Sequence, residues 1–205
     1  MKKLVYLISP NKIHNDFYDD LKKVLSARNV KFFQLRLKKI KKDKIVKIAK
    51  KIKKITRKFN VKLIINDHPN ISKITNADGC HLGQKDSSVK NAKKQLKNKI
   101  IGVTCHNSKS LAKIAVQNKA DYLAFGSFNK SKLKPNAKKA NLNILKWAKR
   151  NIKKPIIAIG GINNSNYKKF IKYGAKYIAL SSYIWDNPKL NRKLQLESLN
   201  ENYSY

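Results

Sequence analysis

The sequence predicts an α/β fold, a single (β/α)8 TIM barrel with parallel strands. Apolar runs suited to strands alternate with amphipathic segments suited to helices, and no Pro/Gly/Ser-rich linker or change of composition interrupts the alternation. The 205 residues, 41% of them hydrophobic, suffice for such a barrel at the short end of its size range. A doubly wound open sheet is the alternative, because pattern alone does not reveal whether the sheet closes.

The strands and helices are expected in strict alternation. The apolar runs suited to strands cover residues 4–9, 32–37, 61–66, 79–83, 100–106, 122–128, 155–161 and 177–184. Segments with apolar residues at helical spacing lie between these runs, among them 16–27, 42–59, 108–117, 141–150 and 165–173. Since nothing divides this series, residues 1–205 are expected to form one barrel domain, with 187–205 as a peripheral C-terminal segment.

Local signals mark the ends of two of these helices. Asn107 or Ser108 is expected to cap the helix over 108–117. Ser165 is expected to cap the helix that follows it, and Gly174 to end that helix.

The charge of the chain is strongly positive, with 48 Lys and Arg against 11 Asp and Glu and a formal net charge of +37. A basic face can bind nucleic acid by neutralising phosphates. The cations here are nearly all Lys and lie along the polar faces of helices, which is typical of a solvated surface, and no nucleic-acid motif accompanies them. We therefore expect no nucleic-acid partner, although the positive field would attract small phosphorylated molecules.

The expected location is the cytoplasm. No apolar run approaches the roughly 18 residues that a membrane-spanning helix needs, so we expect no membrane association. The apolar run near the N-terminus is short and stops at Pro10, which favours a first strand over a signal peptide. Cys80 and Cys105 lie within apolar strand-like runs, which indicates two reduced, buried thiols.

Polar residues interrupt the second predicted strand where a buried parallel strand should be nearly all apolar. Gln34, Arg36 and Lys38 alternate with Leu35 and Leu37, so the period of two places the three polar groups on one face. In a barrel this face would point inward at the mouth, where one amide and two cations would suit a diphosphate. The alternative is a solvated strand edge.

Scarce acids follow the next two strands. Asn66 and Asp67 end the third strand, and Gln84 and Asp86 follow the fourth. Carboxylates at adjacent strand ends can share a Mg²⁺ ion, which favours a few carboxylates together with water and phosphate oxygens. The alternative is that each acid caps a turn or pairs with a nearby Lys.

The last strands end in small residues. Gly160 and Gly161 follow the seventh strand, while Ser181 and Ser182 lie on the eighth. This is where such barrels usually bind phosphate through backbone N–H groups, although a glycine pair also serves tight turns. Thr104 and His106 end the fifth strand, and His81 within the fourth is expected to be a packing residue.

From residue 1 to about residue 185 the chain resembles the thiamine-phosphate synthase family. The motifs that carry the resemblance, in the family's order, are QLRLK, IIND, DGCHLGQKD, GVTCHNS, DYLAFGSF, AIGGI and GAKYIALSSYI. The resemblance implies a (β/α)8 barrel, usually a homo-oligomer. It implies a transferase that joins 4-amino-5-hydroxymethyl-2-methylpyrimidine diphosphate to 4-methyl-5-(2-hydroxyethyl)thiazole phosphate, giving thiamine phosphate and diphosphate.

The resemblance also implies roles for particular residues. Those that would hold the pyrimidine diphosphate are Gln34, Arg36, Lys38 and Asn66, with Thr104 where the family usually has Ser. Those that would bind Mg²⁺ are Asp67 and Asp86, and those that match the thiazole phosphate site are Gly161, Ser181 and Ser182. In the family's Thr-x-Thr-Lys loop the chain keeps a hydroxyl at Ser131 and the cation at Lys134, but Leu133 replaces the second hydroxyl.

The expected chemistry needs no nucleophilic side chain. The pyrimidine's amino group can expel diphosphate to leave a stabilised cation, which the thiazole nitrogen captures, while Mg²⁺, Arg36, Lys38 and Lys134 offset the charge on the leaving group. One alternative is a barrel that resembles thiazole tautomerase, in which His106 would move protons on thiazole carboxylate phosphate. The other is a non-enzymatic basic protein, which would bind RNA or DNA in a salt-sensitive manner.

Overall fold

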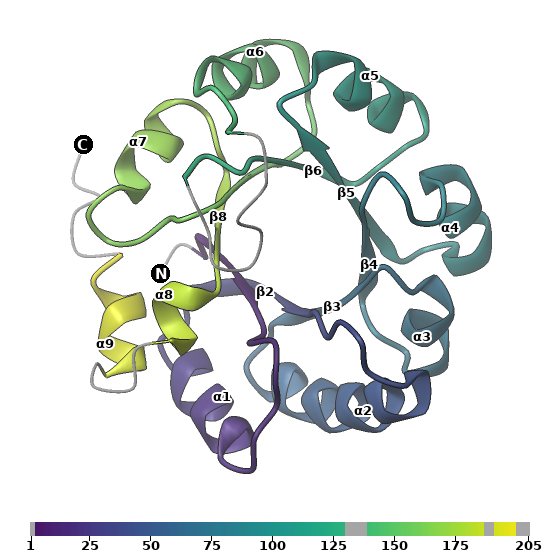
Figure 1. Ribbon diagram of the computed structural model, residues 1–205, viewed down its shortest axis with the longest axis vertical. Helices are drawn as coiled ribbons and strands as arrows, with labels where there is room; N and C mark the ends of the chain where they lie inside the picture. The colour runs from purple at the N-terminus through teal and green to yellow at the C-terminus, as the bar shows by residue number, and fades with distance from the viewer. Residues whose placement is uncertain (1–2, 130–138, 187–190, 200–205) are drawn as a thin grey trace.

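The strands of the computed structural model close into a parallel barrel in the order β1-β2-β3-β4-β5-β6-β7-β8 (Figure 1). The structure describes residues 3–129, 139–186 and 191–199. The strands are β1 (Val5–Ile8), β2 (Val30–Leu35), β3 (Lys62–Asn66), β4 (Gly79–Leu82), β5 (Ile100–His106), β6 (Tyr122–Phe125), β7 (Ile156–Ile159) and β8 (Tyr177–Leu180). Because β1 pairs with both β2 and β8, the open-sheet alternative is wrong and the predicted barrel is confirmed.

Helices surround the barrel on its outer side (Figure 1). They are α1 (Phe17–Leu25), α2 (Lys42–Lys58), α3 (Pro69–Ile74), α4 (Val89–Leu96), α5 (Lys109–Gln117), α6 (Asn143–Asn151), α7 (Tyr167–Lys172), α8 (Ser182–Trp185) and α9 (Arg192–Glu197). In α2, Ile45, Ala49 and Ile52 are buried against the barrel while most of the lysines face outward. None of the helices in the described ranges is long and apolar enough to span a membrane.

The predicted helix ends are partly correct. Ser108 caps α5, since its hydroxyl accepts a hydrogen bond from the N–H of Leu111 at 3.2 Å, and Gly174 follows α7 with a φ of +112°. The prediction for Ser165 is wrong, because its hydroxyl instead donates to the side-chain oxygen of Asn163 at 2.7 Å and α7 begins two residues later. The competing turn interaction explains the difference.

The last predicted strand, 177–184, is also too long. Residues 177–180 form β8, but Ser182 begins the short helix α8. The indole N–H of Trp185 donates to the backbone oxygen of Ile8 at 2.7 Å, which ties α8 to the end of β1. That contact between distant parts of the chain is invisible in the local apolar pattern.

The interior of the barrel is filled mostly by large side chains of inward-facing strand positions. Tyr6, Phe32, Tyr122 and Tyr177 pack together inside it. A methyl group at Gly102 would lie 1.8 Å from the ring of Tyr122, so the glycine provides the space that the ring occupies. This packed floor leaves the C-terminal ends of the strands as the open end of the barrel.

The C-terminal helix α9 packs on the outside of the barrel beside α1 and α8 (Figure 1). The guanidinium of Arg192 pairs with Asp20 of α1 at 2.9 Å. The buried amide of Asn29 donates to the backbone oxygen of Leu196 at 2.6 Å. Residues 191–199 are therefore held against α1 and the loop that precedes β2.

Candidate functional site

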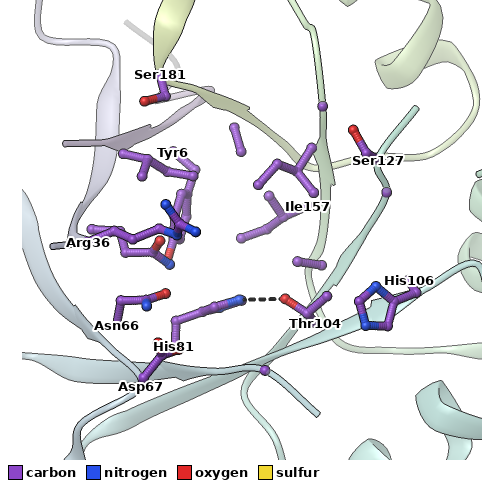
Figure 2. A pocket seen from close by; sticks show the side chains of 18 of the residues that line it. Tyr6, Arg36, Asn66, Asp67, His81, Thr104, His106, Ser127, Ile157 and Ser181 are labelled. Carbon is purple, nitrogen blue, oxygen red and sulfur yellow. Dashed lines mark hydrogen bonds between the residues drawn. The ribbon is translucent and has the colours of Figure 1, made fainter. Parts of the chain in front are cut away.

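A cavity of about 990 Å³ opens at the C-terminal ends of the strands. Its wall contains residues from β1 through β8 or from the loops that follow them. Figure 2 shows Arg36, Asn66 and Asp67 on one side of it and Ser127 on the other. The cavity therefore has a side rich in charge and a side built from small residues.

Gln34, Arg36 and Lys38 all line this cavity, as their alternation predicts. Gln34 is the only one of the three on a strand, since β2 ends at Leu35, and its buried amide donates to the hydroxyl of Tyr6 at 2.8 Å. Arg36 is held by its backbone N–H, which donates to the hydroxyl of Ser9 at 3.0 Å. Burial lowers the pKa of Arg36, and the nearby carboxylate of Asp67 opposes that effect.

Asp67 and Asp86 meet at the charged side of the cavity. Asp67 has a φ of +64° directly after β3, and its N–H donates to the backbone oxygen of His81 at 2.8 Å. Its carboxylate forms an ion pair with the ammonium of Lys38. Asp86 accepts a hydrogen bond from the N–H of Gly83 at 2.7 Å. The two acids thus make the contacts of the alternative interpretation, in which each acid caps a turn or pairs with a nearby lysine. They also lie next to each other.

The proximity of the two carboxyl groups shifts their pKa values in opposite directions. Burial alone would raise the pKa of Asp67, but hydrogen bonds from Lys38 and Asp86 hold it below its usual range. Burial and the neighbouring Asp67 raise the pKa of Asp86. Two carboxyl groups that compete for one proton are a pair in which a divalent cation can replace that proton.

A buried chain of hydrogen bonds runs across the floor of the cavity and was missed by sequence reasoning. The hydroxyls of Tyr6 and Tyr122 are 2.8 Å apart, and that of Tyr122 lies 3.0 Å from Nδ1 of His81. Nε2 of His81 lies 2.9 Å from the hydroxyl of Thr104 (Figure 2). His81 is only 8% exposed yet lines the cavity, so it holds the hydroxyl of Thr104 in addition to its predicted packing role. The feature of the sequence that pointed to this role is the inward-facing position of His81 in the alternation of its strand.

The other side of the cavity is formed by the ends of β7 and β8. Gly160 and Gly161 have φ values of +114° and +55°, and both line the cavity together with Ser181 and Ser182. The hydroxyl of Ser181 donates to the backbone oxygen of Ser9 at 3.3 Å. His106 also lines the cavity, at the exposed end of β5. The predicted loop residues Ser131, Leu133 and Lys134 lie outside the described residues.

Comparisons with known proteins identify the family. The family described as Thiamine monophosphate synthase matches residues 5–184. The chain belongs to this family. The thiamine-phosphate synthase of Pelagibacter ubique (strain HTCC1062) is 57% identical over 189 residues, which cover 92% of this chain and 91% of that protein. The thiamine-phosphate synthase of Erythrobacter litoralis (strain HTCC2594) is 38% identical over 186 residues, with coverage of 88% and 87%.

A solved structure agrees with these thiamine-phosphate synthase relatives. The thiamine phosphate pyrophosphorylase from Pyrococcus furiosus superimposes with a TM-score of 0.86 at 26% identity, covering 97% of this chain and 94% of that one. The predicted family, barrel fold and assignment as a thiamine-phosphate synthase, a transferase, are therefore confirmed. The roles of individual site residues stay predictions, and their shared cavity now provides the geometry on which they can be argued.

Proposed function

We propose that this cavity couples the pyrimidine diphosphate to the thiazole phosphate and releases diphosphate. The proposal is supported by the two different sides of this one cavity. Arg36, Lys38 and the two acids lie on one side, and the glycine turn and two serines lie on the other. Each side offers cations or backbone N–H groups to a phosphate-bearing substrate. A shared cavity of about 990 Å³ would hold the two reacting atoms in proximity, which is the main requirement of a bond-forming transfer.

The charged side fits a Mg²⁺ ion. Asp67 and Asp86 lie together and supply hard oxygen ligands. They are a pair, since the described residues contain no group of three or more His, Cys, Asp or Glu side chains arranged to hold a metal. Two carboxylates leave the remaining coordination positions to water and to the substrate diphosphate, which is the arrangement that Mg²⁺ favours. When bound, the ion would neutralise charge on the diphosphate. Lys38, which pairs with Asp67, would then be available to the same diphosphate.

The residues of the chain would act by positioning and by charge stabilisation. The carbon–oxygen bond to diphosphate breaks, its electron pair leaves with the diphosphate, and the thiazole nitrogen donates the pair that forms the new carbon–nitrogen bond. Arg36 and Lys38 stabilise the negative charge on the leaving group, with Lys134 proposed to assist. Gln34 and Asn66 fix the pyrimidine diphosphate, and Thr104 offers it a hydroxyl that His81 orients.

Apolar residues line the cavity between the two polar sides. Ile8, Ala124, Ile157 and Ala179 all contribute to this lining. A cation formed by loss of diphosphate reacts with water as readily as with a thiazole unless water is excluded. The apolar lining supports the proposal because it favours capture by the second substrate.

The experiment that tests the proposal is a coupling assay with purified protein, Mg²⁺ and both substrates. Thiamine phosphate is detected after oxidation to the fluorescent thiochrome. A signal that requires both substrates supports the proposal, whereas silence from folded protein contradicts it. In the latter case conversion of thiazole carboxylate phosphate is measured, and loss of that conversion in His106→Asn would establish the tautomerase alternative.

We further propose a cytoplasmic homo-oligomer without a nucleic-acid or membrane partner. Cys80 and Cys105 are both free and buried, which suits a reducing compartment. Light scattering gives the oligomeric state, and a filter-binding assay with RNA at physiological salt tests the absence of nucleic-acid binding.

A further inference from the structure

Asn129 lies at the start of the loop after β6 and contacts the glycine turn after β7. Its side-chain amide donates to the backbone oxygen of Gly160 at 3.2 Å and to that of Gly161 at 3.1 Å. Its backbone N–H also donates to the oxygen of Gly160, at 3.2 Å. One residue therefore holds two consecutive carbonyl groups of a turn from another strand.

Residues 127–129 pack directly against the glycine turn. The hydroxyl of Ser127 donates to the backbone oxygen of Asn129 at 2.7 Å. A methyl group at Gly160 would lie 2.0 Å from the oxygen of Ser127 and 2.8 Å from the backbone nitrogen of Phe128. The absence of a side chain at Gly160 thus allows residues 127–129 to lie directly on the turn.

Holding the carbonyl groups fixes the direction of the N–H groups. In a planar trans peptide the C=O and N–H bonds point in opposite directions, and the oxygen of Gly160 shares its peptide with the N–H of Gly161. Likewise, the oxygen of Gly161 shares its peptide with the N–H of Ile162. Because Asn129 holds both oxygens, both N–H groups point away from it.

The substrate cavity borders the turn on a surface to which Asn129 does not contribute. Gly161 and Ile162 line that cavity, whereas Asn129 lines a separate hollow. Within the described part of the chain neither of these two N–H groups is paired with an acceptor. The left-handed φ of Gly161, +55°, is typical of the backbone concavities that bind anions through successive N–H groups.

We infer that Asn129 is a positioning residue for phosphate recognition: its amide turns the N–H groups of Gly161 and Ile162 toward the phosphate of the thiazole substrate. The inference rests on the proposed function for the identity of that phosphate. A second amide, that of Asn166, donates to the oxygen of Gly161 at 3.0 Å, so the oxygen of Gly160 is the one that depends on Asn129 for its side-chain donor. Asn129 itself does not touch the substrate.

The test compares two ligands that differ only in the phosphate. Isothermal titration measures the dissociation constants of 4-methyl-5-(2-hydroxyethyl)thiazole phosphate and of its parent alcohol, for wild type, Asn129→Leu and Asn129→Gln. Asn166 still holds the oxygen of Gly161 in this variant, so the lost side-chain bond to the oxygen of Gly160 sets the scale. Asn129→Leu should weaken binding of the phosphate ester by about three- to tenfold and leave the alcohol within about twofold. Asn129→Gln, which keeps the donor, should recover part of the difference.

Asn143→Leu is the matched control, because Asn143 lines the same hollow as Asn129 but its hydrogen bond in the described structure is to Asn141 and not to the glycine turn. It should bind both ligands as wild type does. If Asn129→Leu does not fold, as judged by circular dichroism and thermal melting, Asn129→Ala takes its place. Equal weakening of ester and alcohol, or no weakening of either, overturns the inference.

The same measurements separate this inference from the proposed function. A wild-type protein that prefers the ester to the alcohol but forms no thiamine phosphate would contradict the coupling activity, and a selective loss in Asn129→Leu would still support the positioning role. A wild-type protein that binds ester and alcohol equally has no phosphate site at the turn, which overturns the inference even if coupling proceeds.

Discussion

Replacing Arg36 with Met should remove most of the coupling activity without destabilising the barrel. Among the described residues, the one side-chain hydrogen bond of its guanidinium in the free protein is to the amide oxygen of Asn11 at 3.5 Å, at the limit of a hydrogen bond. Burial lowers the pKa of Arg36, so the surrounding protein already disfavours its charge. The methionine keeps the apolar stem, and the free energy of unfolding should change by less than about 1 kcal/mol.

The expected loss of activity follows from the hydrogen bonds that Arg36 would form with the diphosphate. Charge-assisted bonds contribute about 1.5–3 kcal/mol each, so two of them contribute about 3–6 kcal/mol. At about 1.4 kcal/mol for each factor of ten, kcat/KM should fall by about 10²- to 10⁴-fold. Arg57→Met, on the exposed face of α2, is the control and should retain wild-type kinetics.

Steady-state coupling kinetics and urea unfolding of the same preparations check this prediction. Retention of kcat/KM within threefold would remove Arg36 from diphosphate binding. A loss of activity that parallels a loss of stability would mean that Arg36 is structural.

Two further predictions concern the packing of the barrel. Gly102→Ala places a methyl group 1.8 Å from the ring of Tyr122, so the free energy of unfolding measured in urea should fall by about 1–3 kcal/mol or more. In the control Gly83→Ala the methyl group meets only the carboxylate of Asp86, so the free energy of unfolding should fall by less. Equal losses in the two variants would contradict the packing argument. Burial raises the pKa of Cys105 to about 12 from 9.0, so its thiol should resist Ellman's reagent in the folded protein and react after unfolding. The thiol of Cys105 loses its proton less readily in the folded protein than in the unfolded chain. Its contribution to stability is therefore fully present below pH 9.0 and is lost as pH rises toward 12. Because Cys105→Ala lacks this group, its melting temperature should fall less over that range than that of wild type. Rapid labelling of the folded protein, or identical pH profiles, would refute this assignment.

The sequence predicted which polar residues line the cavity better than it predicted the contacts that support them. Gln34 and Asp67 were found because polar residues at the ends of apolar strands stand out, and the parallel order of the barrel brings such ends together. Closure required pairing between β1 and β8, which lie more than 170 residues apart, as in Val5 with Ile178. A local pattern contains no information on such a register.

The missed features depend on which inward-facing positions meet. Tyr6 and Tyr122 share a hydrogen bond across the barrel, and each alone looks like an ordinary core residue. The role of Asn129 depends on the backbone of a different loop, so its residue type alone does not reveal it. Ser165 failed as a predicted cap because a nearby asparagine side chain accepts its hydroxyl instead. Each of these is a tertiary contact or a competition between local hydrogen bonds.

Both products of the coupling reaction should be measured as a function of Mg²⁺ in wild type and Asp67→Asn. We expect one thiamine phosphate for each diphosphate released, a rate that depends on Mg²⁺ in wild type, and a large loss of that rate in Asp67→Asn with the fold retained. Diphosphate release without thiamine phosphate, or an undiminished rate in Asp67→Asn, would contradict this expectation.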